Sequence, residues 1–338
     1  QPSEMSFALS DANSGLSYAA PRLSGLFAQK SNVFRYEFLK MLWDIVRFSG
    51  HGPRYLRTCD DDATIDDLFR AGNYSRAFED DYLIPMISAI WSAAPGNIGS
   101  LPARHFLHFF ENHGLMKLRK RPQWRVITGG SRNYIDPLIH GFRERVHVDA
   151  PVEQIQRHAD HVTLRMERGE SLDFDHVVLA LHSNQALRIL ADATDDETEI
   201  LGAMPYQANR VALHTDTSIL PENRKAWASW NYRKRRGGNG GANLTYDMNR
   251  LQSLTAQKDY LVSVNMDGIV APDKILGQYT YSHPQYSQRF VAAQARHHEI
   301  SGQQRTHYCG AYWGYGFHED GVRSALKACE WFGAGTLM

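Results

Sequence analysis

The sequence has few cysteines, no excess of charge of either sign and no long uninterrupted hydrophobic run. Its 338 residues contain three cysteines, Cys59, Cys309 and Cys329, widely spaced and without a CxxC pair, so neither a disulfide framework nor a cysteine zinc site is indicated. Lysine plus arginine and aspartate plus glutamate number 37 each, a balance that is not typical of a general nucleic-acid-binding protein. We expect a cytoplasmic protein in a reducing compartment, with no nucleic-acid partner.

The longest stretch without a charged side chain, residues 82–103, is interrupted by helix-breaking residues. They are Pro85, Pro95, Gly96, Gly99 and Pro102. Prolines and glycines at this density prevent the continuous apolar helix that crosses a bilayer. We therefore expect a soluble protein without a transmembrane segment, although peripheral contact with a membrane is compatible with the sequence.

Several short catalytic motifs are also absent. Without GxSxG, HExxH or a P-loop, the chain lacks the minimal chemistry of a serine hydrolase, a zinc protease or a nucleoside triphosphatase. His105 and His108, with Glu111 and His113 nearby, have a spacing at which two imidazoles share one helix face and could hold a metal. Because they flank an apolar helix face, we expect ordinary helix residues there and no metal site.

Hydrophobic periodicity predicts a mostly helical region over residues 1–120. Apolar residues recur at helical spacing over 33–48, and Gly50, Gly52 and Pro53 follow as a stop signal. A second helical block begins with Thr64 as its N-cap, and helical spacing resumes over 78–91.

After residue 124 the pattern changes to strands. Three segments alternate apolar and polar residues and predict a half-exposed antiparallel meander. They are 146–150, 152–156 and 161–166. The apolar end of 174–181 predicts a strand buried on both faces, as in a parallel sheet, and strand signals between 209 and 266 predict a second sheet. The basic run 233–236 within it predicts a solvated hairpin tip, and lipid phosphates or nucleic acid are its alternative partners.

Two glycine-rich turns each precede a predicted helix. Gly310, Gly314 and Gly316 come before Asp320, which can cap a helix. The expected buried face of that helix is Val322, Ala325, Leu326, Cys329 and Phe332. A helix N-terminus at such a turn suits a phosphate or the N1/C2=O edge of a flavin, and an ordinary capped helix after a loop is the alternative. The second turn is TGGS, residues 128–131.

A family resemblance rests on three segments taken together: TGGSRNYIDPLI (128–139), the meander region 152–181, and YCGAYWGYGFHEDGVRSALKA (308–328). In order and spacing they resemble the later flavin-binding segments of the FAD-dependent amine oxidase, protoporphyrinogen oxidase and phytoene desaturase superfamily. EMSFALS, FEDDYLIPMISAIWSAAP, FFENHGLM and TYDMNRLQSL more specifically resemble bacterial predicted NAD/FAD-binding oxidoreductases associated with cyclopropane fatty-acid synthases.

The resemblance implies an α/β fold: an FAD/NAD(P)-binding, Rossmann-like domain, together with an α+β substrate domain that has a mostly antiparallel sheet. It places residues 121–199 and 305–338 in the FAD-binding domain and residues 1–120 and 200–304 in the substrate domain. Members of the superfamily begin with a βαβ unit that carries GxGxxG, and that motif is missing from this sequence. We therefore expect weak FAD binding by these residues alone, and an upstream βαβ unit to restore it.

The resemblance also implies which residues meet the cofactor FAD. The cofactor-binding residues carried over are Gly130, Val152, Gly310, Gly316, Glu319, Asp320 and Val322. His318 is the candidate catalytic base, because it adjoins the glycine turn and histidine as a residue type exchanges a proton near neutral pH. No metal ligand is implied.

The implied function is a flavin-dependent oxidoreductase that transfers a hydride from a carbon centre to FAD, on a small-molecule or lipid substrate such as a fatty acyl chain. A set of aromatic residues could line an apolar substrate tunnel or simply pack the core. They are Trp227, Trp230, Tyr232, Tyr246 and Trp313. The alternative function is a non-catalytic subunit that handles lipid or binds a partner and keeps the oxidoreductase fold without tight FAD binding.

Overall fold

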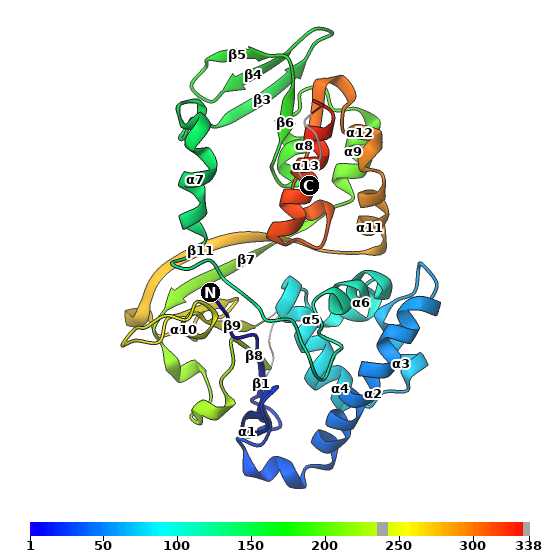
Figure 1. Cartoon of the computed structure of the whole chain (residues 1–338), viewed down its shortest axis with the longest axis vertical. Helices are drawn as coiled ribbons and strands as arrows, with labels where there is room; N and C mark the ends of the chain where they lie inside the picture. Colours follow the sequence, from blue (N-terminus) through cyan, green and yellow to red (C-terminus); the bar gives the residue numbers. More distant parts are fainter. Residues whose placement is uncertain (235–242, 334–338) are drawn as a thin grey trace. The chain divides into compact units, whose positions relative to one another are not determined.

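The computed structural model describes residues 1–234 and 243–333, and it divides the chain into two compact units (Figure 1). The first contains residues 1–140 and 208–283, and the second contains residues 141–207 and the chain from 284 onward. Arg235 and Arg236 of the basic run lie outside the described residues. The assignment of an FAD-binding domain to 121–199 and 305–338 stays a prediction, and residues 121–140 of that range lie in the first unit.

The first unit is built on a seven-stranded sheet in the order β11-β7-β10-β9-β8-β1-β2. The strands are β1 (Phe7–Asp11), β2 (Ser17–Ala20), β7 (Tyr206–His214), β8 (Trp230–Lys234), β9 (Leu244–Asp247), β10 (Leu261–Val264) and β11 (Ile275–Pro284). β1 runs parallel to β8, whereas β1–β2, β8–β9, β9–β10 and β7–β10 are antiparallel. The prediction of a second, mostly antiparallel sheet between 209 and 266 is confirmed.

The strands β1 and β2 are where the helical prediction for residues 1–120 is wrong. The sequences FALSD and SYAA are short and small-residue-rich, and the pairing of β1 with both β2 and β8 gives them their extended form. Pairing with a strand more than 200 residues away leaves no signal in local periodicity.

The other main elements of the region 1–120 are helices, joined by turns and irregular segments. They are α1 (Leu23–Leu26), α2 (Tyr36–Thr58), α3 (Ile65–Gly72), α4 (Arg76–Phe78), α5 (Ile84–Trp91) and α6 (Ala103–Asn112), with a π-helical segment over Glu79–Leu83. Thr64 caps α3 as predicted: its hydroxyl accepts the Asp67 N–H at 3.2 Å, and its own N–H donates to the Asp67 carboxylate at 2.9 Å.

α2 continues past the stop signal at Gly50, Gly52 and Pro53, which corrects the predicted end at residue 48. Tertiary packing provides the reason. Gly52 is buried, and a Cβ there would come 2.7 Å from the Met116 sulfur, so the glycine lets the helix pack closely against that residue. Beyond Pro53, Leu56 is buried as well.

The second unit contains a three-stranded meander and a pair of parallel strands. β3 (Val152–Arg157), β4 (Val162–Met166) and β5 (Ser171–Phe174) pair antiparallel in sequence order, whereas 146–150 forms no strand, so the predicted meander begins one segment too early. The short β5 is formed by pairing with β4, which the sequence pattern did not show.

The parallel pair joins β6 (Val177–Leu179) to β12 (Thr306–Tyr308), which brings together segments more than 120 residues apart. The apolar end of 174–181 therefore forms the predicted strand in a parallel sheet, and its partner is β12. Val178 remains 47% exposed, so β6 is buried on one face and not on both. Helices α8 (Ser183–Ile189), α9 (Asp195–Gly202), α11 (Gln288–Ala295), α12 (His297–Ile300) and α13 (His318–Glu330) belong to the same unit (Figure 1).

A buried ionic network ties these elements together. Arg157, at the end of β3, donates to both oxygens of Glu197 on α9, at 2.5 and 2.9 Å. The same guanidinium donates to the Asp192 carboxylate at 2.9 Å. The hydroxyl of Tyr308, in β12, donates to Glu197 at 2.6 Å. One arginine therefore links the meander, a helix and the parallel strand pair.

Burial by itself would raise the pKa of Glu197, but the hydrogen bonds from Arg157 and Tyr308 outweigh it and hold that pKa below its ordinary value. Burial and the neighbouring carboxylate raise the pKa of Tyr308, which keeps its proton and remains a donor.

None of the helices among the described residues is long and apolar enough to cross a membrane.

We expect Glu197→Gln to destabilise the protein by about 2 kcal/mol at pH 7, because it removes the buried carboxylate partner of Arg157 and leaves the guanidinium with the partly exposed Asp192. The depressed pKa of Glu197 means that its stabilisation is complete above the unfolded value of about 4.3 and is lost as pH falls through the folded value. The acid-induced loss of stability should therefore be shallower in the variant. Urea unfolding followed by circular dichroism from pH 3 to 7 measures both effects.

Glu199→Gln is the matched control, because this carboxylate lies on the same helix, is exposed and pairs with Arg296 at the surface. Its unfolding should stay close to wild type. Equal effects of the two substitutions would contradict the role given to the buried network.

Candidate active site

Two parallel strands end side by side at one edge of the second unit. After Leu179, the last residue of β6, the chain passes Leu181 and enters α8 at Ser183. After Tyr308, the last residue of β12, it passes Gly310 and enters α13. Ligands of open α/β sheets bind outside the carboxyl ends of parallel strands, at the N-termini of the helices that follow. This edge is therefore the candidate active site.

The connection from β12 to α13 is a glycine crossing, which we define as residues 310–316. Gly310 has φ +154°, and its N–H donates to the Ser324 hydroxyl at 2.8 Å. Gly316 has φ +90°, and a Cβ there would come 3.1 Å from the Tyr286 hydroxyl. Both backbone angles favour glycine, so the crossing presents backbone where another residue would present a side chain.

Side chains from the α11 region hold the crossing in place. Gln294 donates to the carbonyl oxygens of Tyr312 and Gly314, at 2.7 and 2.6 Å. The Tyr286 hydroxyl donates to the same Gly314 carbonyl at 3.0 Å. Sequence analysis missed Tyr286 and Gln294, because their partners are backbone groups about 20 to 30 residues further along the chain and no motif marks them.

The N-terminus of α13 is fixed by Asp320, although not as the N-cap that the sequence suggested. The helix begins at His318, so Phe317 is the N-cap and Asp320 is the third helical residue. The Asp320 carboxylate accepts the Phe317 N–H at 3.0 Å, which is the return half of a capping box. Glu319 is exposed and pairs with Arg323 at 3.2 Å.

The buried face of α13 differs from the prediction. Ser324 and Ala328 are its buried residues, whereas Val322 is 54% exposed, Leu326 is 40% exposed and Cys329 is exposed. Ser324 bonds the Gly310 N–H, so the polar residue faces the crossing. The apolar stripe lies on the outer side of the helix among the described residues.

The site residues predicted from the resemblance fall into three places. His318, Glu319, Asp320 and Val322 follow Gly310 and Gly316 directly, in the crossing and the first turns of α13. Val152 is the first residue of β3, beside an irregularity in its pairing with β4.

Gly130 belongs to the first unit, where it has φ +96° and precedes a short 3-10 turn over Ser131–Tyr134. Its N–H donates to the Ile127 carbonyl at 2.9 Å. The structure therefore brings together the predicted residues from Gly310 to Val322, and it does not test their distance from Gly130.

His105 and His108 lie on α6, where His105 is buried and His108 is exposed. Burial, with the nearby His108, lowers the pKa of His105 to about 4. Across residues 1–234 and 243–333, no three His, Cys, Asp or Glu side chains come together as a metal-binding group.

The five aromatic residues proposed as a tunnel lining or core do not lie in one place. Trp227 packs in an apolar core with Leu220 and Leu261 and donates to the Pro221 carbonyl at 2.6 Å. Trp230 packs edge-on against Tyr246 and also lines a cavity, and Trp313 lies in the glycine crossing of the other unit. The set is therefore not one continuous lining.

Three solved structures are similar over almost the whole chain. A fatty acid isomerase from P. acnes that produces CLA has a TM-score of 0.66 at 14% identity, covering 98% of this chain and 81% of its own. Cyclohexylamine oxidase from Brevibacterium oxydans has a TM-score of 0.60 at 15% identity, with the same coverage. A putative protoporphyrinogen oxidase from Exiguobacterium has a TM-score of 0.60 at 15% identity, covering 98% and 80%. These similarities establish the fold.

Curated proteins gave no match to the sequence. The family model for flavin containing amine oxidoreductases, in contrast, matches residues 32–258, which is well over half of the chain. The chain belongs to this family, whose cofactor is FAD.

Proposed function

We propose that this protein is a flavin-dependent oxidoreductase that removes a hydride from a carbon centre of its substrate, with the flavin ring at the glycine crossing. The observation that carries the proposal is the edge where β6 and β12 end together, with bare backbone at Gly316 and a helix N-terminus directly after it. Membership of the flavin-containing family supports the choice of cofactor.

The residues present fit the flavin end of the cofactor. A flat ring needs backbone that it can approach closely, and the positive φ of Gly316 keeps that position without a side chain. When bound, FAD supplies the electron-accepting ring. The N-terminus of α13 carries a partial positive charge, which would stabilise negative charge on a flavin ring bound there. Gly310, Glu319, Asp320 and Val322 surround this position in our proposal.

Gly130 and Val152 are proposed as contacts further along the cofactor, Val152 through its backbone at the adenine. The 338 residues contain no GxGxxG turn for the pyrophosphate, so the proposal gives them the flavin end and not the diphosphate.

His318 is proposed as the group that accepts the substrate proton. It is the first residue of α13, directly after the glycine crossing, and its side chain is exposed. A lipid substrate, such as a fatty acyl chain, is the proposed substrate class, and the similarity in fold to a protein named a fatty acid isomerase agrees with it.

The first test of the proposal is Gly316→Val. A branched side chain cannot adopt φ +90° without strain, and its Cβ would approach the Tyr286 hydroxyl, so we expect loss of flavin binding with the fold retained. The measurement is quenching of flavin fluorescence and the visible absorbance of protein reconstituted with FAD, with an upstream GxGxxG unit attached where the chain alone binds weakly.

Gly321→Ala is the control for this substitution. Its Cβ would meet only ordinary contact, with the nearest atom, Ala311 N, 3.9 Å away, and alanine favours the helix. Flavin binding should persist in this variant. Undiminished flavin binding by the Gly316→Val variant would show that the flavin ring does not bind at the crossing.

Asp320→Ala removes the acceptor of the Phe317 N–H and should cost about 1 kcal/mol of stability, while it weakens flavin binding only modestly. Thermal unfolding of the variant, compared with Glu319→Ala, measures the effect. Glu319 contributes an exposed ion pair alone, so its substitution should shift the midpoint less. The reverse order would contradict the capping role of Asp320.

His318→Gln should slow anaerobic bleaching of the flavin by substrate at least tenfold and leave flavin binding unchanged, because it removes a proton acceptor and keeps a similar volume. Stopped-flow absorbance measures the rate. A protein that binds flavin and is never reduced by any alkyl or acyl substrate would instead support the non-catalytic subunit.

A further inference from the structure

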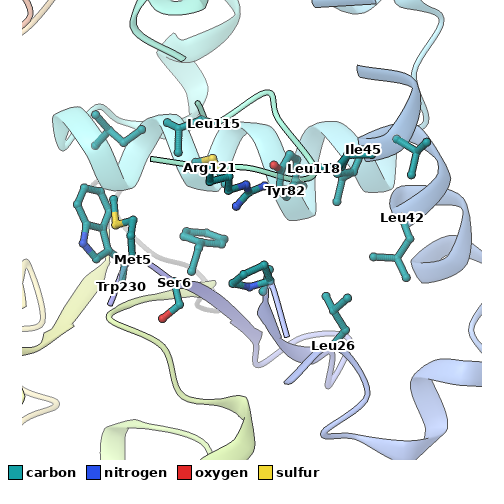
Figure 2. Close-up of a pocket in the computed structure, with 16 residues that line it drawn as sticks. Met5, Ser6, Leu26, Leu42, Ile45, Tyr82, Leu115, Leu118, Arg121 and Trp230 are labelled. Carbon is teal, nitrogen blue, oxygen red and sulfur yellow. The ribbon is translucent and has the colours of Figure 1, made fainter. Parts of the chain in front are cut away.

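An apolar cavity lies in the first unit, between α2, α5 and the start of β1 (Figure 2). Its volume is about 270 Å³, just below the roughly 300–1,000 Å³ range of small-molecule sites. Leu42 and Ile45 of α2 and Met86 and Ile90 of α5 are among its lining residues.

One charged residue, Arg121, lines this cavity, and no aspartate or glutamate does. Figure 2 shows its guanidinium on the inner side of the ring of lining side chains, beside Tyr82. Its Nε donates to the Lys117 carbonyl at 2.6 Å, which orients the group and leaves the two terminal nitrogens for a ligand.

Tyr82 adds a second donor at the same place. Burial raises the pKa of its hydroxyl, and the nearby Arg121 charge acts in the opposite direction, so the phenol keeps its proton at neutral pH. A guanidinium and a phenol together can bind the two oxygens of one carboxylate. A cationic amine would find no carboxylate in this lining to neutralise it.

Arg121 also stands where the apolar cavity meets a polar one. Met5, Leu115 and Arg121 line both this cavity and a neighbouring cavity of about 470 Å³, whose further lining includes Glu4 and Gln123. An apolar tail on one side of Arg121 and a hydrated head on the other is the arrangement that an amphiphile requires.

We propose that this cavity binds a single-chain amphiphile with an anionic head, its alkyl chain among Leu42, Ile45 and Met86 and its carboxylate on Arg121 and Tyr82. If the amphiphile is the substrate, the inference rests on the proposed flavin enzyme and gives the head group and chain type of its substrate. Binding of the amphiphile as such depends only on the residues that line the cavity.

The test is binding of a matched twelve-carbon series to the purified protein, by displacement of a fluorescent fatty-acid analogue below the micellar concentrations. The series is laurate, dodecyl phosphate, dodecanol and dodecylamine. Laurate should bind about tenfold more tightly than dodecanol, and dodecylamine should bind most weakly. The phosphate arm identifies the head group, since tighter binding of dodecyl phosphate would assign an alkyl phosphate to the same site. Equal affinity for laurate, dodecanol and dodecylamine would overturn the proposal.

Two sets of variants locate the site. Arg121→Gln should abolish the preference for laurate over dodecanol, Arg121→Lys should restore part of it, and Arg119→Gln, two residues away and outside this lining, should change nothing. Val46→Trp should fill the cavity and weaken laurate and dodecanol alike, whereas Leu39→Trp, on the same helix and outside the lining, should not. Val46 is 48% exposed and Leu39 is 43% exposed, so both variants should fold.

Because the displacement assay needs no flavin, the two proposals fail separately. Binding of laurate that depends on Arg121, in a protein whose flavin laurate never reduces, would keep the cavity assignment and remove its role as substrate site. A protein that is reduced by its substrate and has no Arg121-dependent binding of laurate would overturn the cavity assignment alone.

Discussion

The buried ion pair between Arg157 and Glu197 is the interaction on which the second unit depends. β6 and β12 have three residues each, too few to form a stable two-stranded sheet by themselves. The Tyr308 hydroxyl fixes β12 to Glu197, and Glu197 is fixed in turn by Arg157 from the meander. Because Gly310 follows Tyr308 by two residues, the position of the glycine crossing is set by a charge pair that takes no part in the chemistry.

Elements with a local sequence pattern could be predicted, and elements that depend on distant partners could not. Periodicity and turn residues found α3 with its cap at Thr64, the strands around β7–β10 and the strand β6, because each leaves a local pattern. The strand β1 and the continuation of α2 through Pro53 could not be found this way. Both are stabilised by partners distant in sequence, and those contacts override local propensity.

At the candidate site, too, some residues could be predicted from the sequence and others could not. The glycines and acids from Gly310 to Asp320 stand in one continuous motif, so their neighbourhood in space follows from the chain itself. Gln294, Tyr286 and Arg121 carry no motif, and only the fold shows that they face a backbone carbonyl or a cavity. The exposed stripe of Val322 and Leu326 was misassigned for a physical reason: helical spacing shows that an apolar face exists, but not what packs against it.

Gln294 supports the glycine crossing by two hydrogen bonds, although it lies outside the glycine motif. The side chain donates to the carbonyl oxygens of Tyr312 and Gly314, which belong to the crossing. Exchange of this glutamine for another donor would change the electron density on those peptide groups, and so the polarity of the crossing, while every residue of the glycine motif stayed the same. In our proposal, which places the flavin ring at the crossing, such an exchange would alter the redox behaviour of the flavin without any change in the motif.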